Sequence, residues 1–214
     1  MSGEGTTWDP AAGGIATCVV AQGAGGSTRS PLFDGIAAGL TSSGVSSFRF
    51  DFPYTLAGRR GPDRPPVLLQ AWREALAEAA ALADGTPLVA SGKSMGGRMA
   101  SMLAAEDGDA FAARALVFFG YPLHPPGKVD RLRVEHLPRI TVPMLFIQGT
   151  GDALGRFDLV EDTVASLGKR ARLHAIDGGD HSFRVRGRKR PDREIGEDVG
   201  GIAAAFIRDV VEGG

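Results

Sequence analysis

The stretch VASGKSMGG, residues 89–97, decides the fold of this 214-residue chain. An apolar run breaks there into GKSMG, residues 92–96, which fits two incompatible motifs. GKS can end a phosphate-binding P-loop, whereas GKSMG matches G-x-S-x-G, the sharp strand-to-helix turn that presents a nucleophilic serine. A P-loop needs its first glycine five residues before Gly92, but Pro87 stands there and residues 87–91 read as the strand itself. No length remains for a phosphate loop, so the sequence favours the nucleophile turn.

Apolar runs alternate with helix-period segments on both sides of this turn. The runs are nearly continuous, as in strands buried on both faces of a parallel sheet. The predicted strands are Ile15–Ala21, Ser47–Phe52, Pro87–Ser91, Ala115–Gly120, Pro143–Gln148 and Ala171–Ile176. The predicted helices are 31–43, with Ser30 as N-cap and Gly44 as the stop, 66–84, ending at Gly85, Met95–Glu106, Phe157–Leu167 and Glu197–Val211. This alternation predicts an α/β fold, a three-layer α/β/α sandwich with a mainly parallel sheet of about six to seven strands.

Composition and charge restrict the possible partners. The 24 Lys and Arg residues nearly balance the 25 Asp and Glu residues, and a formal net charge of -1 argues against nucleic acid or anionic lipid. The single cysteine, Cys18, lies in an apolar run, as expected of a buried thiol in a reducing compartment. The first residues lack a secretion signal, and no run reaches the roughly 20 apolar residues of a membrane span. We expect one cytoplasmic domain over residues 1–214, with no nucleic-acid or membrane partner; nothing in the sequence indicates an oligomeric state.

Two polar residues follow later strands in the order that a Ser–acid–His triad requires. GTGDALG places Asp152 just beyond one predicted strand, and DGGDHSF places His181 on the glycine-rich loop after the next. Functional sites of such sheets lie at the carboxyl ends of the strands. His181 would take the proton of Ser94 and later protonate the leaving group, while Asp152 would hold the imidazole in the correct tautomer. The sequence predicts these three residues as the catalytic groups.

Each assignment has an alternative. Asp152 can instead brace a turn, and His181 can be an ordinary loop histidine. Rival acids are Asp158 and Asp162, which fall in a helix-period segment, and Asp177 and Asp180, which are too close in sequence to His181. Of the other histidines, His174 is expected to pack within its strand and His136 to be structural.

An oxyanion hole needs backbone donors aimed at the carbonyl oxygen. Met95, directly after the serine, supplies one N–H, and the loop AQGAGGS supplies the other from Ala24 or, less favourably, Gly25. GAGGST can also be compared with a dinucleotide fingerprint, but Thr28 stands where the last glycine belongs, and Asp51 is the only acid near the end of the second strand. We predict no cofactor, and because no His, Cys, Asp or Glu cluster has ligand spacing, no metal. The residues expected near the substrate pocket are Gln22, Tyr54, Tyr121, His124 and Phe183. Simple packing is the alternative for the three aromatic residues, and an ordinary loop role is the alternative for His124.

Several blocks in order resemble a known family: GAGG, FRFDFPY with RRGPDRPP, GKSMGGR, GYPLHPPGK, HLPRITVPMLFIQGTGD and GGDHSF. Together they resemble the small, lidless predicted hydrolases of the α/β-hydrolase superfamily, related to dienelactone-hydrolase-like enzymes and to a domain of a nonspecific-lethal chromatin complex subunit. The resemblance extends from about the first strand to His181. It implies Ser94 as nucleophile, Asp152 as acid and His181 as base. The oxyanion loop departs from the family pattern, since Gln22-Gly23 stands where His-Gly is common.

The connection from Tyr121 to Arg139 is too short for a cap domain, so the sequence predicts an open site suited to small substrates. We expect a serine hydrolase that cleaves a small-molecule carboxylic ester, thioester or related acyl bond. The alternative is a binding or scaffolding module with an unused triad. The basic run RVRGRKRPDR, residues 184–193, is expected to be a solvated connection, with a patch for an acidic substrate group as the other interpretation.

Overall fold

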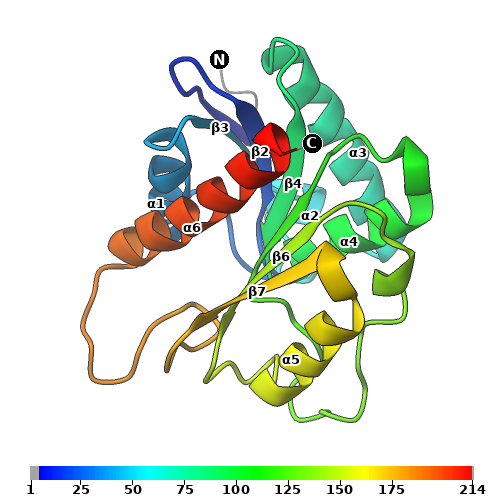
Figure 1. The fold of residues 1–214 in the computed structure, drawn as a ribbon, viewed down its shortest axis with the longest axis vertical. Coiled ribbons are helices and arrows are strands. Elements are labelled where there is room, and N and C mark those ends of the chain that lie inside the picture. Colours follow the sequence, from blue (N-terminus) through cyan, green and yellow to red (C-terminus); the bar gives the residue numbers. More distant parts are fainter. Residues whose placement is uncertain (1–4, 214) are drawn as a thin grey trace.

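A seven-stranded sheet lies between two layers of helices in the computed structural model, which describes residues 5–213 (Figure 1). The strand order is β1-β3-β2-β4-β5-β6-β7; β1 is antiparallel to β3 and the other neighbours are parallel. The strands are β1 Thr6–Asp9, β2 Ala16–Ala21, β3 Val45–Phe50, β4 Leu88–Lys93, β5 Leu116–Phe119, β6 Met144–Gly149 and β7 Ala171–Ile176. The helices are α1 Pro31–Thr41, α2 Pro53–Leu56, α3 Pro65–Leu82, α4 Met95–Asp107, α5 Phe157–Ser166 and α6 Asp192–Glu212.

The predicted three-layer sandwich with a mainly parallel sheet is confirmed, and the differences are local. The strand β1 and the one-turn helix α2 were not predicted, because four residues are too few to establish a hydrophobic period. β4 continues two residues beyond Ser91, since Gly92 and Lys93 still pair with β5. α6 begins at Asp192 rather than Glu197 because its first turn is charged and carries little apolar signal. Ser30 occupies the N-cap position of α1, but its side chain makes no capping hydrogen bond.

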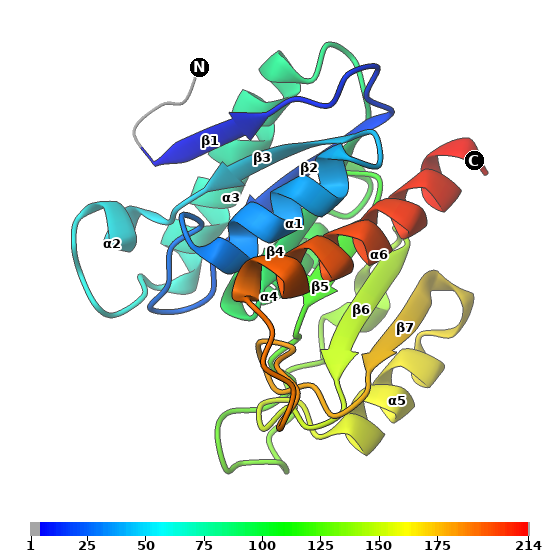
Figure 2. The ribbon, with the colours of Figure 1, turned by 90° about the vertical axis from the view of Figure 1, so that its left-hand side faces the viewer.

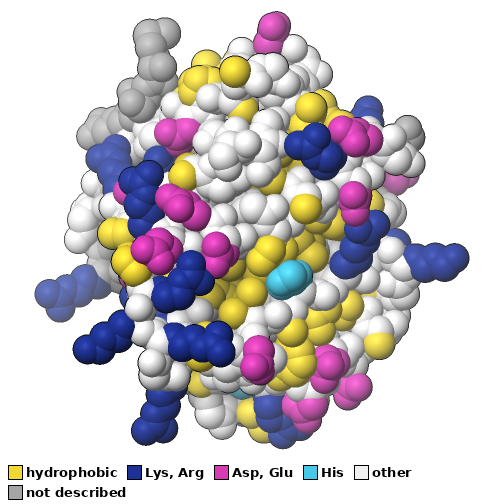
Figure 3. Space-filling view, turned by 60° about the vertical axis from the view of Figure 1, so that its left-hand side comes forward, with side chains coloured by type: hydrophobic (Ala, Val, Ile, Leu, Met, Phe, Trp, Pro, Cys, Tyr) yellow, Lys and Arg dark blue, Asp and Glu magenta, His cyan; other side chains and the backbone are white. Residues whose placement is uncertain are grey.

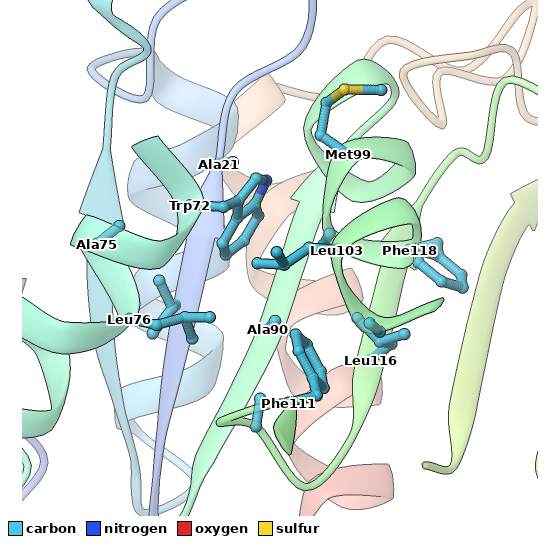
Figure 4. Packing of buried hydrophobic residues seen from close by; sticks show 14 of the residues in the cluster. Ala21, Trp72, Ala75, Leu76, Ala90, Met99, Leu103, Phe111, Leu116 and Phe118 are labelled. Carbon is cyan, nitrogen blue, oxygen red and sulfur yellow. The ribbon is translucent and has the colours of Figure 1, made fainter. Parts of the chain in front are cut away.

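Each face of the sheet carries its own core. α3, α4 and α5 cover one face, where Trp72 and Leu76 of α3 meet Leu103 of α4 over β4 and β5 (Figure 4). α1 and α6 cover the other face, and the buried Cys18 belongs to that core. The Trp72 indole N–H donates to the Gly96 carbonyl oxygen at 3.1 Å. This hydrogen bond fixes the first turn of α4, and with it the turn that precedes the helix.

The helices α1 and α6 cross in direct backbone contact (Figure 2). A methyl group on Gly35 of α1 would lie 2.0 Å from the Arg193 carbonyl oxygen, and one on Gly196 of α6 would lie 2.1 Å from the Leu32 carbonyl oxygen. Glycine at these positions is therefore required by the close approach of the two helices. Gly39 lies four residues after Gly35 on α1, and Gly200 lies four residues after Gly196 on α6. These two glycines also approach the other helix closely, so the contact follows one face of each helix.

We expect Gly196→Ala to destabilise the protein by about 1–3 kcal/mol, because the methyl group must push α6 away from α1. Gly201→Ala is the matched control on the same helix, since nothing lies within 4 Å of its added methyl group. Alanine also favours a helix over glycine by about 1 kcal/mol, so the control should be neutral or stabilising. Urea denaturation of both variants measures the difference; equal stabilities would contradict the close packing.

The segment between β5 and β6 contains only the short 3-10 turn Leu137–Arg139 as regular structure, so no cap domain covers the carboxyl ends of the strands. Within residues 5–213, no helix combines the length and hydropathy needed to cross a membrane.

Candidate active site

Ser94 lies at the tip of the turn between β4 and α4, with φ 52° and ψ -117°. This backbone conformation is strained for a residue with a side chain, and such strain concentrates at functional sites. The glycines around it permit the turn: a methyl group on Gly92 would lie 2.5 Å from the Gly97 nitrogen, and one on Gly96 would lie 2.4 Å from the Gln22 carbonyl oxygen. The G-x-S-x-G glycines are therefore needed for backbone contact across the turn.

The loops after β6 and β7 are also in backbone contact through glycines. A methyl group on Gly149 would lie 2.2 Å from the Gly179 carbonyl oxygen, and the Gly151 N–H donates to that same oxygen at 2.9 Å. This contact brings GTGD and GGDH side by side. It explains why both motifs contain glycines, and it places Asp152 of one loop beside His181 of the other.

The Asp152 carboxylate and the His181 ring are joined by a hydrogen bond. His181 Nδ1 lies 2.7 Å from Asp152 Oδ2, and the Asp152 side chain is fully buried. Gln148 Nε2 donates to the same Oδ2 at 2.7 Å, and the Leu154 N–H donates to Oδ1 at 2.8 Å. Gln148 is itself fixed, because its Oε1 accepts from the Tyr121 N–H at 2.8 Å. Three donors therefore hold the carboxylate in one orientation.

Ser94 and His181 both lie beside the end of β5. The Ser94 N–H donates to the Phe119 carbonyl oxygen at 3.2 Å, while a methyl group on the next residue, Gly120, would lie 3.4 Å from His181 Nδ1. Both residues line one cavity. Within residues 5–213, His181 Nε2 is buried without a hydrogen-bond partner, and no hydrogen bond joins it to Ser94 Oγ. Catalytic hydrogen bonds of free enzymes are commonly long and tighten when substrate binds.

Two backbone N–H groups beside Ser94 are free to bind an oxyanion. Among the described residues, neither Met95 nor Ala24 donates its N–H to an acceptor, and both line a cavity with Ser94. Gly25 differs, because its N–H donates to the Tyr54 hydroxyl at 3.2 Å. The geometry therefore favours Ala24 over Gly25 as the second donor.

Asp51 fixes the loop that carries the candidate donor Ala24. Its carboxylate accepts from Ser27 Oγ at 2.6 Å and from the Thr28 N–H and Oγ1 at 2.6 and 2.8 Å. In a dinucleotide site this aspartate would bind the ribose, but here its carboxylate already accepts hydrogen bonds from the protein itself. The GAGGST loop is the wall of the Ser94 site.

Ser94 stands between two cavities. The first, of about 340 Å³, contains the two candidate oxyanion donors and is called the arginine cavity here; it is lined by Ala24, Pro62, Asp63, Pro65, Leu68, Ser94, Met95, Arg98, Met99, Pro122, His124, Pro126, Arg133 and Leu154. The second, of about 380 Å³, contains the histidine and is called the histidine cavity; it is lined by Gly23, Ala24, Gly26, Ser27, Ser30, Leu32, Phe33, Lys93, Ser94, Leu154, His181 and Ser182. A substrate bound across the serine has room on both sides.

Comparison with known proteins agrees with this geometry. Residues 14–207 match the family described as "Alpha/beta hydrolase domain". The chain belongs to this α/β-hydrolase family. Among similar solved structures, Est1E from Butyrivibrio proteoclasticus has a TM-score of 0.72 at 16% identity, covering 97% of this chain and 94% of that chain.

Two further structures share the fold. A lidless α/β serine hydrolase from Xanthomonas campestris has a TM-score of 0.70 at 20% identity, covering 95% of this chain and 87% of that one. Dienelactone hydrolase from Anabaena variabilis has a TM-score of 0.68 at 21% identity, covering 94% and 89%. The predicted family, and the α/β-hydrolase fold without a cap domain, are confirmed.

Of the five predicted pocket residues of this α/β-hydrolase, His124 alone lines a cavity beside Ser94. Gln22 is buried and donates to Thr55 and to Tyr54, whose hydroxyl supports the Gly25 N–H, so both residues brace the oxyanion loop from behind. Tyr121 lies in the core, where its hydroxyl donates to the Arg133 carbonyl oxygen. These three line neither cavity beside Ser94, because the Gln22 amide nitrogen and both tyrosine hydroxyls are hydrogen-bonded within the protein.

Two other side chains also differ from expectation. Phe183 is buried on the α6 side of the sheet, away from both Ser94 cavities. His174 is exposed on the edge strand β7 rather than packed. His124 has a structural role as well, since its Nε2 accepts from the Arg156 N–H at 3.2 Å.

Three of the six basic residues in the run 184–193 are neutralised by ion pairs within the protein. Arg184 pairs with Asp192, Arg190 with Asp198, and Arg193 with Glu197. Basic and acidic side chains are interspersed over the face shown in Figure 3. None of these ten residues lines either cavity beside Ser94, so this run offers no contact to a substrate there.

Lys93 is a site residue that sequence reasoning missed. It is only 7% exposed, its Nζ donates to the His181 carbonyl oxygen, and it lies 6.0 Å from the centre of the Phe183 ring. Burial lowers the pKa of Lys93 to about 8, against the opposing influence of Asp152 and Asp180. The sequence offered one signal for this residue, which is a charged lysine at the end of an otherwise apolar strand.

The lowered pKa predicts that Lys93 makes stability depend on pH. Because the folded-state pKa lies below the unfolded value of 10.5, the penalty for burying the charge is complete below pH 8 and is relieved between about pH 8 and 10.5. Relative to Lys93→Met, the free energy of unfolding of the wild type should rise over this window by up to roughly 3 kcal/mol. Denaturation of both proteins across this range measures it. Lys169→Met, which removes an exposed lysine, should show no such trend; parallel curves for Lys93→Met and wild type would contradict the shift.

Proposed function

We propose that this α/β-hydrolase is a serine hydrolase that cleaves small carboxylic esters or thioesters through an acyl-enzyme. The observation that carries the proposal is the 2.7 Å hydrogen bond from His181 Nδ1 to Asp152, which leaves Nε2 as the reactive nitrogen in a cavity shared with Ser94. The ordered carboxylate sets the imidazole tautomer that a general base needs.

In the first half of the reaction, Ser94 Oγ attacks the carbonyl carbon and His181 Nε2 takes the hydroxyl proton. The Met95 and Ala24 N–H groups bind the oxyanion of the tetrahedral intermediate. The bond to the leaving oxygen or sulfur then breaks, and His181 returns the proton to that atom. In the second half, water attacks the acyl-enzyme, His181 takes its proton, and Ser94 leaves with that proton as the acid is released.

Family membership supports hydrolytic chemistry in general, and the lidless serine hydrolase with this fold supports acyl transfer in particular. The open carboxyl edge of the sheet and the two cavities of about 340 and 380 Å³ suit small substrates better than long buried lipid chains.

A fluorophosphonate probe tests this proposal directly. We expect one covalent adduct per chain, located by mass spectrometry on the peptide that contains Ser94, and no adduct after preincubation with an irreversible serine-hydrolase inhibitor. Acetyl and butanoyl p-nitrophenyl esters then test turnover. A folded protein that neither reacts with the probe nor hydrolyses these esters would instead support the binding-module alternative.

A further inference from the structure

Arg98 is a partly buried cation without a partner beside the proposed nucleophile. It lies four residues after Ser94 on α4, whose first turn joins the Arg98 N–H to the Ser94 carbonyl oxygen at 3.0 Å. Both residues line the arginine cavity. Within residues 5–213, its Nε is buried with no hydrogen-bond partner, and its guanidinium forms no ion pair. A desolvated charge is costly unless an opposite charge meets it.

Arg133 adds a second cation to the same arginine cavity. Its backbone is fixed on both sides, because its N–H donates to Leu123 at 2.8 Å and its carbonyl oxygen accepts from the Tyr121 hydroxyl at 3.0 Å. Its guanidinium likewise makes no ion pair with any described residue. Burial lowers the pKa of Arg98 and the nearby Arg133 lowers it further, whereas Tyr121 and Glu135 act in the opposite direction.

The acidic groups nearby do not neutralise this pair. Asp63 lines the arginine cavity, but its Oδ1 accepts from Arg59 at 2.7 Å, and the two form an ion pair. Glu135 is exposed and lines a different hollow on the outer side of Arg98. The arginine cavity therefore keeps a surplus of positive charge next to the serine.

The position of the two arginines indicates which part of the substrate they would contact. The candidate oxyanion donors Met95 and Ala24 share the arginine cavity, and the acyl chain must leave the carbonyl carbon close to them. His181, which protonates the leaving group, lines the other cavity with Ser27 and Ser182. The acyl chain therefore extends toward Arg98, and the alcohol or thiol occupies the histidine cavity.

We propose that Arg98 and Arg133 bind a carboxylate at the far end of the acyl chain, so that the substrates are half-esters or half-thioesters of short dicarboxylic acids. This inference rests on the proposed function and names its substrate class. A carboxylate matches the planar donor geometry of a guanidinium, and it would supply the acceptor that Arg98 Nε lacks. Ser94 and Arg98 line the same cavity of about 340 Å³, which favours a short chain.

The test compares monoethyl glutarate with ethyl pentanoate, which has a methyl group in place of the carboxylate. We expect kcat/KM, measured by ethanol release, to be at least about 10-fold higher for the half-ester, since its carboxylate accepts charge-assisted hydrogen bonds and the methyl group of ethyl pentanoate accepts none. Carboxymethyl butanoate carries its carboxylate on the alcohol side and should not share this advantage.

Arginine variants distinguish carboxylate binding by these two residues from a general preference of the protein for anionic substrates. Arg98→Met should lower the ratio of half-ester to neutral ester toward one, and Arg133→Met should lower it in the same direction. Arg131→Met is the matched control, because Arg131 is exposed in the same connection and lines neither cavity. Its ratio should equal that of the wild type.

The outcomes distinguish the two proposals. If ethyl pentanoate is hydrolysed as well as monoethyl glutarate, or if the ratio survives in both Arg98→Met and Arg133→Met, the carboxylate site is wrong and the serine hydrolase proposal stands. If no ester is hydrolysed and the fluorophosphonate probe does not label Ser94, both proposals fail. Weaker inhibition of ethyl pentanoate hydrolysis by free glutarate in Arg98→Met would support the site independently of the comparison between substrates.

Discussion

Ser94→Ala should lower kcat/KM for a small ester by about 10⁴-fold or more, because the substitution removes the only atom that can form the acyl-enzyme. The loss should appear in kcat, since the cavities and the two oxyanion donors remain. Residual activity above the uncatalysed rate would come from those donors. Stopped assays at high enzyme concentration measure the residual rate, and the fluorophosphonate adduct should disappear in parallel.

The Ser94 variant is informative because its fold should be preserved. Among the described residues, no hydrogen bond from the Ser94 hydroxyl is lost, and alanine keeps the Cβ atom at the strained turn. Ser182→Ala is the matched control: it removes another hydroxyl from the wall of the same histidine cavity and should cost at most a few-fold. A Ser94→Ala protein with near wild-type turnover would rule out the acyl-enzyme.

The sequence predicted the positions of the candidate catalytic groups because spacing alone determines them. Ser94 follows a strand within a glycine pattern, and Asp152 and His181 follow later strands whose apolar runs are easy to recognise. Parallel strands then bring their carboxyl ends to one edge. The backbone contact of Gly149 with Gly179 completes the arrangement, and both glycines belong to the motifs that were noticed.

The direction of a side chain was harder to predict than its position. Tyr54 and Tyr121 are close to the site in sequence, yet both rings turn into the protein and use their hydroxyls for internal hydrogen bonds. Arg98 was recognisable as a charged residue in the first turn of the helix that follows Ser94. Arg133 was not, since it lies in an irregular connection whose path depends on tertiary contacts.

Asp152→Asn should lower kcat by about 10⁴-fold, the loss known for a triad whose carboxylate becomes an amide. The hydrogen bonds around the side chain explain why the amide cannot substitute. Oδ1 accepts from the Leu154 N–H, and Oδ2 accepts from Gln148 and faces His181 Nδ1. In either orientation of an asparagine amide, its NH₂ group would therefore face another hydrogen-bond donor.

Gln148 cannot rotate to rescue the amide, because its Oε1 already accepts from the Tyr121 N–H at 2.8 Å. An NH₂ group at the Oδ2 position would instead donate a hydrogen bond to His181 Nδ1. The imidazole would then carry its proton on Nε2 and could no longer accept the proton of Ser94. Fluorophosphonate labelling of Asp152→Asn should slow together with ester turnover. Asp177→Asn is the control, since Asp177 is exposed on the loop before His181 and should leave the rate within about two-fold. A fully active Asp152→Asn protein would show that its carboxylate only braces the turn, and the base would then have to be oriented by another group.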